Sequence, residues 1–264
     1  MPFKLFRSKT TPAPVAHSTD GRLIYAIGDV HGHLALLDAL LDTIAADAAG
    51  RTASGPPVLV LVGDYIDRGP QSREVIDRLM ALEARAAERG EFEPRFLLGN
   101  HEQTMLAFLD GPEGGPAWAD FGGGATLASY GVPPPPGRGD AAAWADVQAR
   151  FKAAVPPGHV AFLRRLELSA RYGDYLFVHA GVRPGVPLDR QDPEDLVWIR
   201  GDFLNTAHRL GVVVVHGHTP AEAPFLGADR INIDTGAYAT GVLTAVRLDG
   251  GPPVVLQSQK SDQR

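Results

Sequence analysis

The chain contains the stretch Leu23-Ile24-Tyr25-Ala26-Ile27-Gly28-Asp29-Val30-His31-Gly32, an apolar run that ends directly at a carboxylate and an imidazole. The apolar residues predict a short buried strand. Asp29 and His31 stand two positions apart, so both side chains point to the same side of an extended backbone. The neighbouring glycines allow a sharp turn. This stretch therefore predicts oxygen and nitrogen donors together at the end of a strand.

The same arrangement recurs further along the chain. Apolar runs over residues 58–62, 95–98, 175–178 and 212–215 each end at a segment with polar donors, and each run predicts a buried strand. The four segments are Gly63-Asp64-Tyr65-Ile66-Asp67-Arg68-Gly69, Gly99-Asn100-His101-Glu102, His179-Ala180-Gly181 and Gly217-His218-Thr219-Pro220. Because the carboxyl ends of parallel strands meet at one edge of a sheet, we expect these donors to converge.

Helical patterns separate the first three strands. Apolar residues recur at steps of three and four over residues 34–44 and 75–82. Two successive right-handed strand–helix–strand units would place three parallel strands side by side. Alternating residues over 231–248 predict two strands of a second sheet. The fold class predicted is α/β.

The middle of the chain breaks this rhythm. Residues 111–158 include three consecutive glycines at 122–124 and four prolines at 133–136, which cannot belong to a central strand or helix. We interpret this segment as an inserted lid with short helices. The predicted domain covers residues 21–250, and residues 1–20 and 251–264 are predicted to be flexible tails.

Composition excludes several classes of protein. The 264 residues carry a formal charge of −6, which predicts no binding to nucleic acid or to an anionic membrane surface. No apolar stretch approaches the roughly 20 residues of a membrane span, and no apolar block marks an export signal. We therefore expect a cytoplasmic protein. The chain has no cysteine, which excludes a thiolate nucleophile.

In this order, the five segments resemble those of the metal-dependent phosphoprotein phosphatases within the calcineurin-like metallophosphoesterases. The similarity covers roughly residues 21–248 and is greatest to small bacterial and phage serine/threonine phosphatases. It implies two mixed β-sheets sandwiched between helices. It also implies that two divalent metal ions activate water, which attacks the phosphate ester directly.

The resemblance also implies a ligand set. Asp29 and His31 would hold the first metal and Asp64 would bridge both, whereas Asn100, His179 and His218 would hold the second. Two carboxylates leave two divalent ions with excess positive charge for a phosphate anion. We expect manganese, and oxygen and nitrogen ligands also allow iron, zinc or magnesium.

His101 is the predicted proton donor because it directly follows the ligand Asn100. Asp67 would orient its imidazole and keep it protonated. The alternative for Asp67 is a salt bridge to Arg68 or Arg73.

Arg68 and Arg200 are predicted to bind the substrate phosphate together with Asn100, because a guanidinium offers a fork of donors to two phosphate oxygens. The prediction for Arg200 depends on the element Leu196-Val197-Trp198-Ile199-Arg200, which resembles the Trp-x-Arg element of bacterial members. The alternative is an ordinary surface arginine.

Other residues leave two interpretations open. His216 is either a metal contact or a packing residue. Trp118, Phe121 and Tyr130 in the insert either contact the substrate or form a packing cluster. Among the remaining histidines, His33 is predicted to begin a helix, and His17, His159 and His208 are predicted to be solvated.

The predicted function is a serine/threonine protein phosphatase acting on a phosphorylated protein or a small phosphoester. The nearest rival is a dinucleoside polyphosphate hydrolase, such as one for diadenosine tetraphosphate. That branch lacks an aspartate equivalent to Asp67 and has Asp where this chain has Glu102. Pro220 also favours the phosphatase branch, because other relatives place a ligating histidine there. An inactive metal-binding module is the alternative from another class. The oligomeric state is not predicted.

Overall fold

The computed structural model describes residues 16–207 and 210–259. The predicted tail residues 1–15 and 260–264, and His208, lie outside this range. Within it, no helix combines the length and apolar character needed to cross a bilayer.

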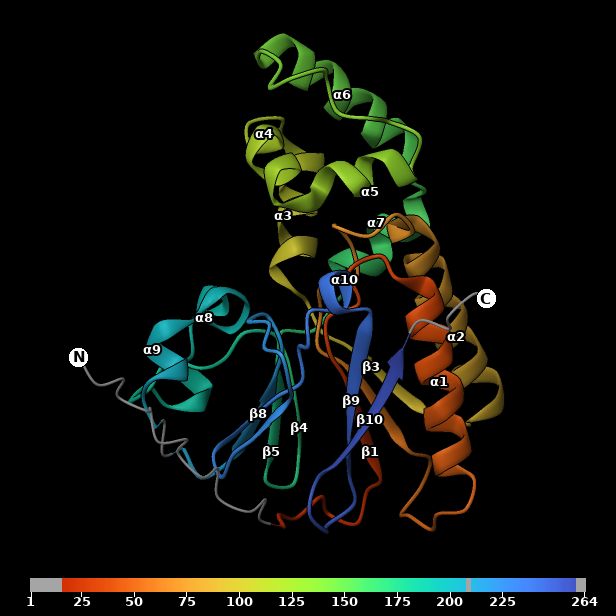
Figure 1. Cartoon of the computed structure of the whole chain (residues 1–264), viewed down its shortest axis with the longest axis vertical. Coiled ribbons are helices and arrows are strands. Elements are labelled where there is room, and N and C mark those ends of the chain that lie inside the picture. Colours follow the sequence, from red (N-terminus) through yellow and green to blue (C-terminus); the bar gives the residue numbers. More distant parts are fainter. Residues whose placement is uncertain (1–15, 208–209, 260–264) are drawn as a thin grey trace, which may run out of the picture.

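The first sheet joins the three predicted amino-terminal strands to two from the carboxyl end of the chain (Figure 1). Its order is β10 (Val254–Gln259), β9 (Val242–Leu248), β1 (Ile24–Ile27), β2 (Val58–Leu61) and β3 (Glu93–Phe96). The strands β1, β2 and β3 are parallel, whereas β9 and β10 are antiparallel to their neighbours. Helices α1 (Leu34–Ala48) and α2 (Ser72–Arg89) provide the predicted crossovers.

The second sheet is also mixed. Its order is β4 (Ser169–Tyr172), β5 (Tyr175–Val178), β6 (Val213–His216), β8 (Arg230–Asn232) and β7 (Phe225–Leu226). The central strands β5, β6 and β8 are parallel. Helices α8 (Pro193–Trp198) and α9 (Gly201–Leu204) cover its outer face.

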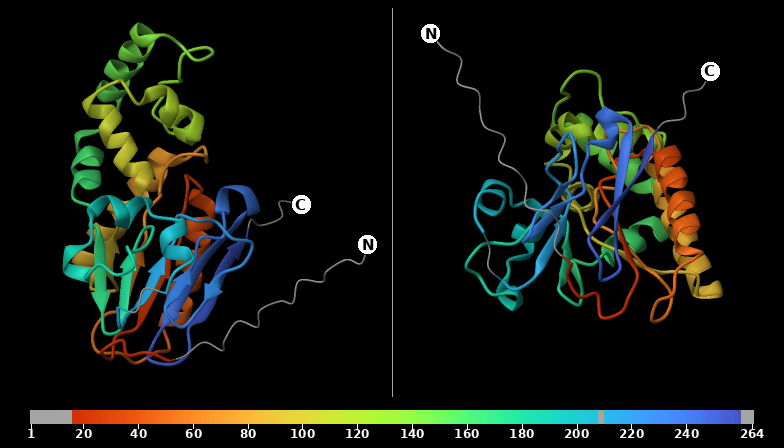
Figure 2. Two further views of the ribbon diagram at one scale, coloured as in Figure 1. Left: turned by 90° about the vertical axis from the view of Figure 1, so that its left-hand side faces the viewer. Right: turned by 60° about the horizontal axis from the view of Figure 1, so that its bottom comes forward.

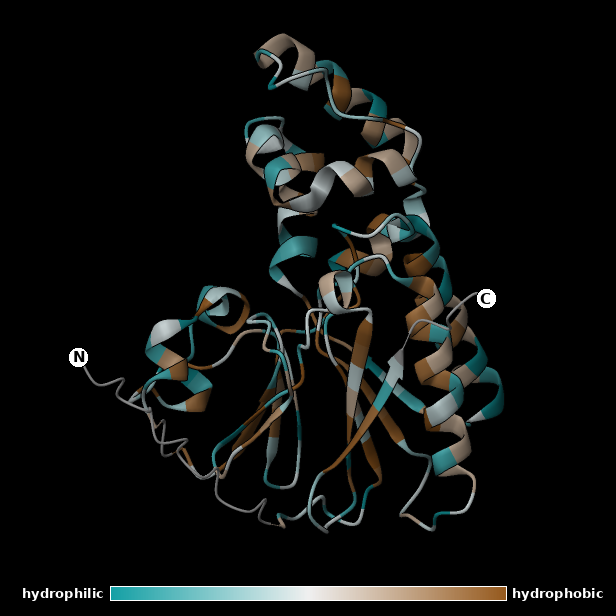
Figure 3. Ribbon diagram, in the orientation of Figure 1, coloured by the Kyte–Doolittle hydropathy of each residue, from teal (hydrophilic) through white to brown (hydrophobic). Residues whose placement is uncertain are grey.

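The two sheets pack face to face over an apolar core. Ile24 and Val60 from the first sheet meet Phe177 and Val215 from the second in one buried cluster. The alternate residues of β1 and β2 turn the other way and pack against α1 and α2. The interior between the layers is correspondingly apolar (Figure 3). This confirms the predicted fold, in which two mixed sheets lie between helices.

Two predictions about the carboxyl-terminal part were wrong. The segment 231–248 does not form two strands of one sheet, because β9 pairs with β1 in the first sheet while β8 lies in the second. Alternation reveals a strand but not its partner. The predicted tail from 251 is also incorrect over 254–259, where β10 pairs with β9 and the buried Ser258 hydroxyl donates to the Leu36 carbonyl.

The end of the predicted amino-terminal tail is held as well. The Ser18 backbone N–H donates to the Asp174 carboxylate at 2.8 Å, and Thr19 is buried. Flexibility predicted up to residue 20 is therefore wrong for these last residues, which lie against the turn between β4 and β5.

A helical lobe rises above the carboxyl ends of the strands (Figures 1 and 2). It starts with α3 (Asn100–Asp110) and continues through α4 (Gly115–Trp118), η1 (Ala119–Gly123), α5 (Gly124–Ser129), α6 (Ala141–Ala154) and α7 (Pro157–Arg164). We call residues 111–158 the helical insert. Its helices were predicted, and their buried aromatic rings Trp118, Trp144 and Phe151 pack with Phe108 of α3 as an extension of the core under α1 and α2.

Candidate metal centre and phosphate site

All six predicted metal ligands are buried at the edge where the carboxyl ends of the parallel strands meet. They are Asp29, His31, Asp64, Asn100, His179 and His218. Parallel pairing sets β1 beside β2 and β5 beside β6, and the face-to-face packing of the sheets brings the two pairs together. The convergence expected from the strand ends is therefore observed.

The backbone at this edge is strained. In the described part of the chain, six non-glycine residues have a positive φ, and five of them are predicted site residues. These five are His31, Asp64, Asp67, Arg68 and His218, with φ between 46° and 71°. Residues with side chains rarely adopt this conformation, and it is often found at functional sites.

Glycines of the motifs make room for the carboxylates. A Cβ atom on Gly99 would lie 2.2 Å from Asp64 Oδ1, and one on Gly217 would lie 2.0 Å from Asp29 Oδ1. Both distances are impossible for a real side chain. The glycines are therefore required by the close approach of these carboxylates to the backbone.

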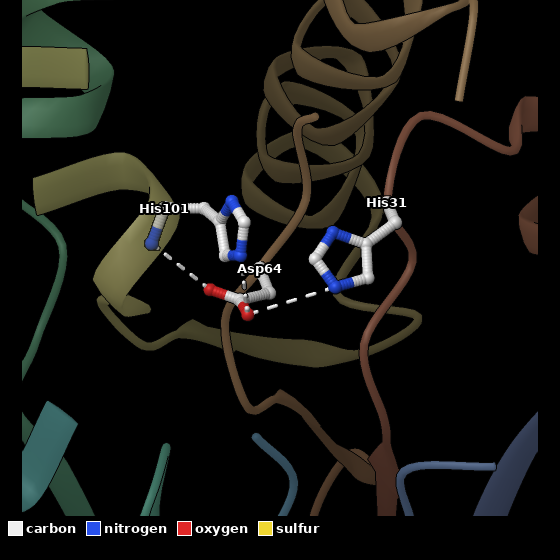
Figure 4. A group of neighbouring side chains, drawn as sticks. All are labelled: His31, Asp64 and His101. Carbon is white, nitrogen blue, oxygen red and sulfur yellow. Dashed lines mark hydrogen bonds and ion pairs between the residues drawn. The ribbon is translucent and has the colours of Figure 1, made fainter. Parts of the chain in front are cut away.

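One group of donors contains His31, Asp64 and His101 (Figure 4). The Nε2 atoms of His31 and His101 lie 3.7 and 3.8 Å from Asp64 Oδ2. His31 Nδ1 donates to the Ile66 carbonyl at 2.8 Å, which turns Nε2 toward Asp64. Burial lowers the pKa of His31 to about 3, so the ring is neutral and can offer a lone pair.

A second group contains Asp64, His179 and His218. Here Asp64 uses its other oxygen, since Oδ1 lies 3.3 Å from His179 Nε2. Asn100 Oδ1 lies 2.9 Å from His179 Nε2 and 2.8 Å from His218 Nδ1. Asp64 thus faces both groups, which is the arrangement expected of a bridging carboxylate.

Among the described residues, Asp29 is a member of neither donor group. Its carboxylate instead accepts from the His218 backbone N–H at 3.1 and 3.3 Å. Burial, followed by repulsion from Asp234 and Asp64, raises the pKa of Asp29 well above its ordinary value. A cation at the centre would favour the ionised form of Asp29, so this carboxyl lies where it could serve a metal ion.

Asp234 is an acidic neighbour that the sequence analysis missed. It is buried, and its Oδ2 has no hydrogen-bond partner among the described residues. A signal was present, because the alternating stretch Ile231-Asn232-Ile233 ends at Asp234, as the first apolar run ends at Asp29.

The donor set fits divalent metal ions. It combines carboxylate and amide oxygens with imidazole nitrogens and has no thiolate, and the buried His218 Nε2 has no hydrogen-bond partner in the described structure. Burying carboxylates this close together is unfavourable without a compensating positive charge. The chemistry therefore supports cations at this edge but does not select one metal.

The predicted proton donor and its partner are in contact. His101 Nδ1 donates to Asp67 Oδ2 at 2.5 Å, and its Nε2 faces the site. Burial lowers the pKa of His101, but Asp64 and the hydrogen-bonded Asp67 outweigh it, and the net pKa is about 9. The ring is thus protonated near neutral pH.

Arg68 reaches into the same space. Its Nη1 lies 2.7 Å from His31 Nε2, and its Nη2 lies 3.2 Å from His101 Nε2. The guanidinium also lies over the ring of Tyr238, 4.4 Å from the centroid. Tyr238, on α10 (Ala237–Thr240), is another site residue that no sequence signal indicated.

A cavity of about 270 Å³ joins both predicted phosphate-binding arginines to the donors. Arg68, Asn100, His101 and Arg200 line it, so the structure brings the predicted phosphate site together. Exposed aromatic side chains complete the wall. Phe121 is 70% exposed and Trp198 is 40% exposed.

For Trp118, Phe121 and Tyr130 the sequence left open either contact with the substrate or packing within the insert, and the structure gives different answers for different rings. Phe121 is available to a substrate. Trp118 is only 1% exposed and Tyr130 is buried, so both belong mainly to the packing cluster. Trp118 nevertheless also lines the cavity, and its Nε1 donates to Asp67 Oδ2 at 2.8 Å.

Two other histidines are buried. His216 packs against Phe203, its Nδ1 donates to the Gly217 carbonyl, and it belongs to neither donor group of the described residues, which favours packing. His159 was predicted to be solvated, and this is wrong. It is buried between the Tyr130 hydroxyl at 2.8 Å and Asp77 at 2.9 Å. The adjacent polar partners explain how the fold accommodates it.

Comparison with known proteins identifies the family. The sequence model for calcineurin-like phosphoesterases matches residues 22–247. The chain belongs to the calcineurin-like phosphoesterase family. It is therefore a metallophosphoesterase, a hydrolase of a family that binds divalent metals, which confirms the family resemblance.

Relatives of this metallophosphoesterase carry different names. It is 27% identical to the asymmetrical bis(5'-nucleosyl)-tetraphosphatase PrpE of Bacillus velezensis, over 88% of this chain and 91% of that protein. It is 30% identical to the Shewanella-like protein phosphatase 2 of Arabidopsis thaliana, over 67% of this chain and 52% of that protein. A solved cold-active protein tyrosine phosphatase shares the fold, with a TM-score of 0.58, 21% identity and coverage of 89% of this chain and 78% of that one.

Proposed function

We propose that this metallophosphoesterase removes phosphate from phosphorylated serine or threonine residues of proteins. The observation that carries the proposal is the His101–Asp67 pair, in which the Asp67 carboxylate holds an imidazole on the wall of the phosphate site. A serine or threonine alkoxide is a poor leaving group, so its departure depends strongly on a proton donor. A site built around such a donor suits this substrate.

The other residues have complementary tasks in this proposal. Asp29, His31 and Asp64 would hold one divalent ion, and Asp64, Asn100, His179 and His218 the other. When bound, such ions lower the pKa of water and offset the phosphoryl charge, and we propose manganese for this role. Arg68 and Arg200 bind the phosphoryl oxygens, while His101 Nε2 donates its proton to the leaving oxygen.

A dinucleoside polyphosphate is the second candidate substrate. It is favoured by the nearly full-length similarity to proteins named bis(5'-nucleosyl)-tetraphosphatases and by the exposed rings of Phe121 and Trp198, on which a base could stack. Its leaving group is a nucleotide phosphate, which departs more readily than an alkoxide. His101 would then matter less to the rate.

A turnover panel tests the proposal. The manganese-loaded protein is assayed on phosphoserine, phosphothreonine and phosphotyrosine peptides and on diadenosine tetraphosphate. We expect the highest kcat/KM on the phosphoserine and phosphothreonine peptides, and a loss of about 10²–10⁴-fold there in His101→Asn, with a smaller loss on p-nitrophenyl phosphate. A clear preference for diadenosine tetraphosphate would establish the second candidate instead. Bound manganese without any turnover would indicate an inactive metal-binding module.

A further inference from the structure

The Asp67 carboxylate is held from two sides. It is fully buried, and Oδ2 accepts from both His101 Nδ1, at 2.5 Å, and Trp118 Nε1, at 2.8 Å. Oδ1 accepts from the Thr126 hydroxyl at 2.5 Å. Among the described residues, His101 is the one cationic partner of Asp67. The remaining donors are neutral, and both come from the helical insert.

The backbone of Asp67 is fastened to the same segment. Its N–H lies within hydrogen-bond distance of the Thr126 hydroxyl, at 2.9 Å, and of the Ser72 hydroxyl, at 3.0 Å. The next residue is fixed too, since Arg68 N–H donates to the Gly122 carbonyl at 3.0 Å. A Cβ atom on Gly122 would lie 2.7 Å from Arg68 Cγ, which shows how closely the insert passes.

These contacts have a physical consequence for His101. A buried carboxylate is unfavourable unless its oxygens are hydrogen-bonded, and donors on both oxygens also fix its rotation. The orientation of the imidazole depends in turn on the oxygen that receives its Nδ1–H. If the Trp118 or Thr126 donor is removed, Asp67 can rotate, and His101 Nε2 no longer has a single direction.

We propose that Trp118 and Thr126 are positioning residues that hold the Asp67 carboxylate where it orients His101 toward the leaving oxygen. The helical insert is then part of the proton-donating apparatus as well as a wall of the substrate cavity. The proposal rests on the proposed role of His101 as proton donor. The competing role for Trp118 is packing alone, since its ring lies 5.2 Å from that of Phe108 and 5.7 Å from that of Phe151.

The insert offers a matched control for the indole N–H. Trp144 is buried in the same cluster and its ring lies 6.0 Å from Phe108, but its Nε1 donates to the Arg138 carbonyl, away from Asp67. Trp118→Phe and Trp144→Phe each replace an indole by a phenyl ring in this cluster. Only the first removes a donor to Asp67. For the hydroxyl, Thr126→Val removes the donor at nearly constant shape, and Thr126→Ser restores it.

The experiment measures kcat and KM of metal-loaded variants on a phosphoserine peptide and on p-nitrophenyl phosphate, together with metal content and melting temperature. We expect Trp118→Phe and Thr126→Val to lower kcat on the peptide roughly tenfold, a part of the range for general acid catalysis. The loss on p-nitrophenyl phosphate should be clearly smaller, with KM and metal content unchanged. Thr126→Ser should behave as wild type, and Trp144→Phe should show no dependence on the leaving group.

His101→Asn distinguishes the proton-donor role of His101 from the positioning role of Trp118 and Thr126. If it loses rate equally on both substrates, the proton-donor role fails and the proposed function with it. If it shows the leaving-group dependence but Trp118→Phe and Thr126→Val match Trp144→Phe, the positioning role alone is overturned. Should Trp118→Phe melt well below Trp144→Phe, the Thr126→Val and Thr126→Ser pair decides the outcome.

Discussion

The candidate metal-binding edge, where the carboxyl ends of the parallel strands meet, and the helical insert are built on opposite principles. At the edge, Asp29, Asp64, His179 and their neighbours are buried polar groups, several of them on strained backbone. In the insert, the interior is a cluster of aromatic rings on short helices. Strained backbone and buried polar groups destabilise the edge, whereas packed aromatic rings stabilise the insert. The two regions meet at Asp67, which lies between His101 and Trp118.

This contrast predicts that substitutions in the two regions fail in different ways. At the edge they should abolish metal binding and turnover while the fold persists. Truncating a buried ring of the insert should lower the stability of the fold while the predicted ligands keep their places. The experiments on Asp64 and Phe151 test this difference directly, and those on His216 and Phe121 test the burial of a histidine at the edge and the use of an exposed ring in the insert.

The largest effect is expected at Asp64, whose two oxygens face the two donor groups. Asp64→Asn removes the charge shared by the two groups, so turnover should fall by about 100-fold or more, since changes to groups that merely support a metal ligand already cost about 10–100-fold in metal affinity or activity. Metal content per chain, measured by elemental analysis, should fall together with the rate, and a chelator should abolish activity. The control is Asp146→Asn on α6, which loses an exposed ion pair to Arg150. Normal metal content in Asp64→Asn would contradict the bridging assignment.

The second effect is on stability. Phe151 is fully buried in the insert and contacts the rings of Phe108, Trp118 and Tyr130. Phe151→Ala should lower the free energy of unfolding by about 3–5 kcal/mol, because it leaves a cavity. Denaturant unfolding measures this loss, and metal content of the folded fraction should stay near that of wild type. If fully folded Phe151→Ala lost metal, the expected difference between the two regions would be contradicted.

The third concerns pH, because the edge contains buried neutral imidazoles. Burial lowers the pKa of His216 to about 3, below the ordinary value of about 6.5. Between these values the unfolded chain binds a proton that the folded chain does not, so stability falls as pH decreases below 6.5. From pH 7 to 5.5 the metal-free protein should lose about 1 kcal/mol more than His216→Gln does. Urea unfolding at both pH values provides the comparison, and parallel losses would place His216 in contact with water.

The smallest effect is expected at Phe121, the exposed ring of the insert. If a base stacks there, Phe121→Ala removes a stacking energy of about 0.5–1.5 kcal/mol. The value of kcat/KM for diadenosine tetraphosphate should then fall roughly 2- to 12-fold. Hydrolysis of p-nitrophenyl phosphate should change less, and melting temperature should be preserved. Equal changes on both substrates would argue against a base-stacking surface.

Much of the arrangement of the candidate site could be predicted from sequence, because each segment of predicted ligands follows an apolar strand. Parallel strand ends converge regardless of side-chain detail, so the order of strands and motifs was enough to place Asp29, Asp64 and His218 together. Strands β1, β2 and β3 could be located because each overlaps an apolar run that ends at one of these motifs.

Contacts that depend on how loops fold could not be predicted. Tyr238 reaches Arg68 because a short helix turns back over the edge, and nothing in its local sequence indicates this. The sequence leaves open whether Trp118 contacts the substrate or packs in the insert, and it gives no sign that the indole donates to Asp67. The sheet to which β9 belongs was equally hidden, because alternation describes the faces of a strand and not its neighbours.

The pairing of β1 with β9 has a consequence for biosynthesis. Ile24 pairs with Leu248, more than 200 positions later, so the strand that precedes the first predicted ligands lacks one neighbour until residue 248 has emerged. At about 5–20 residues per second, this delay is on the order of 10–45 s. Such a high contact order slows folding and leaves an open strand edge on the nascent chain. Hydrolytic competence should therefore arise late and nearly all at once, when β9 and β10 close the first sheet.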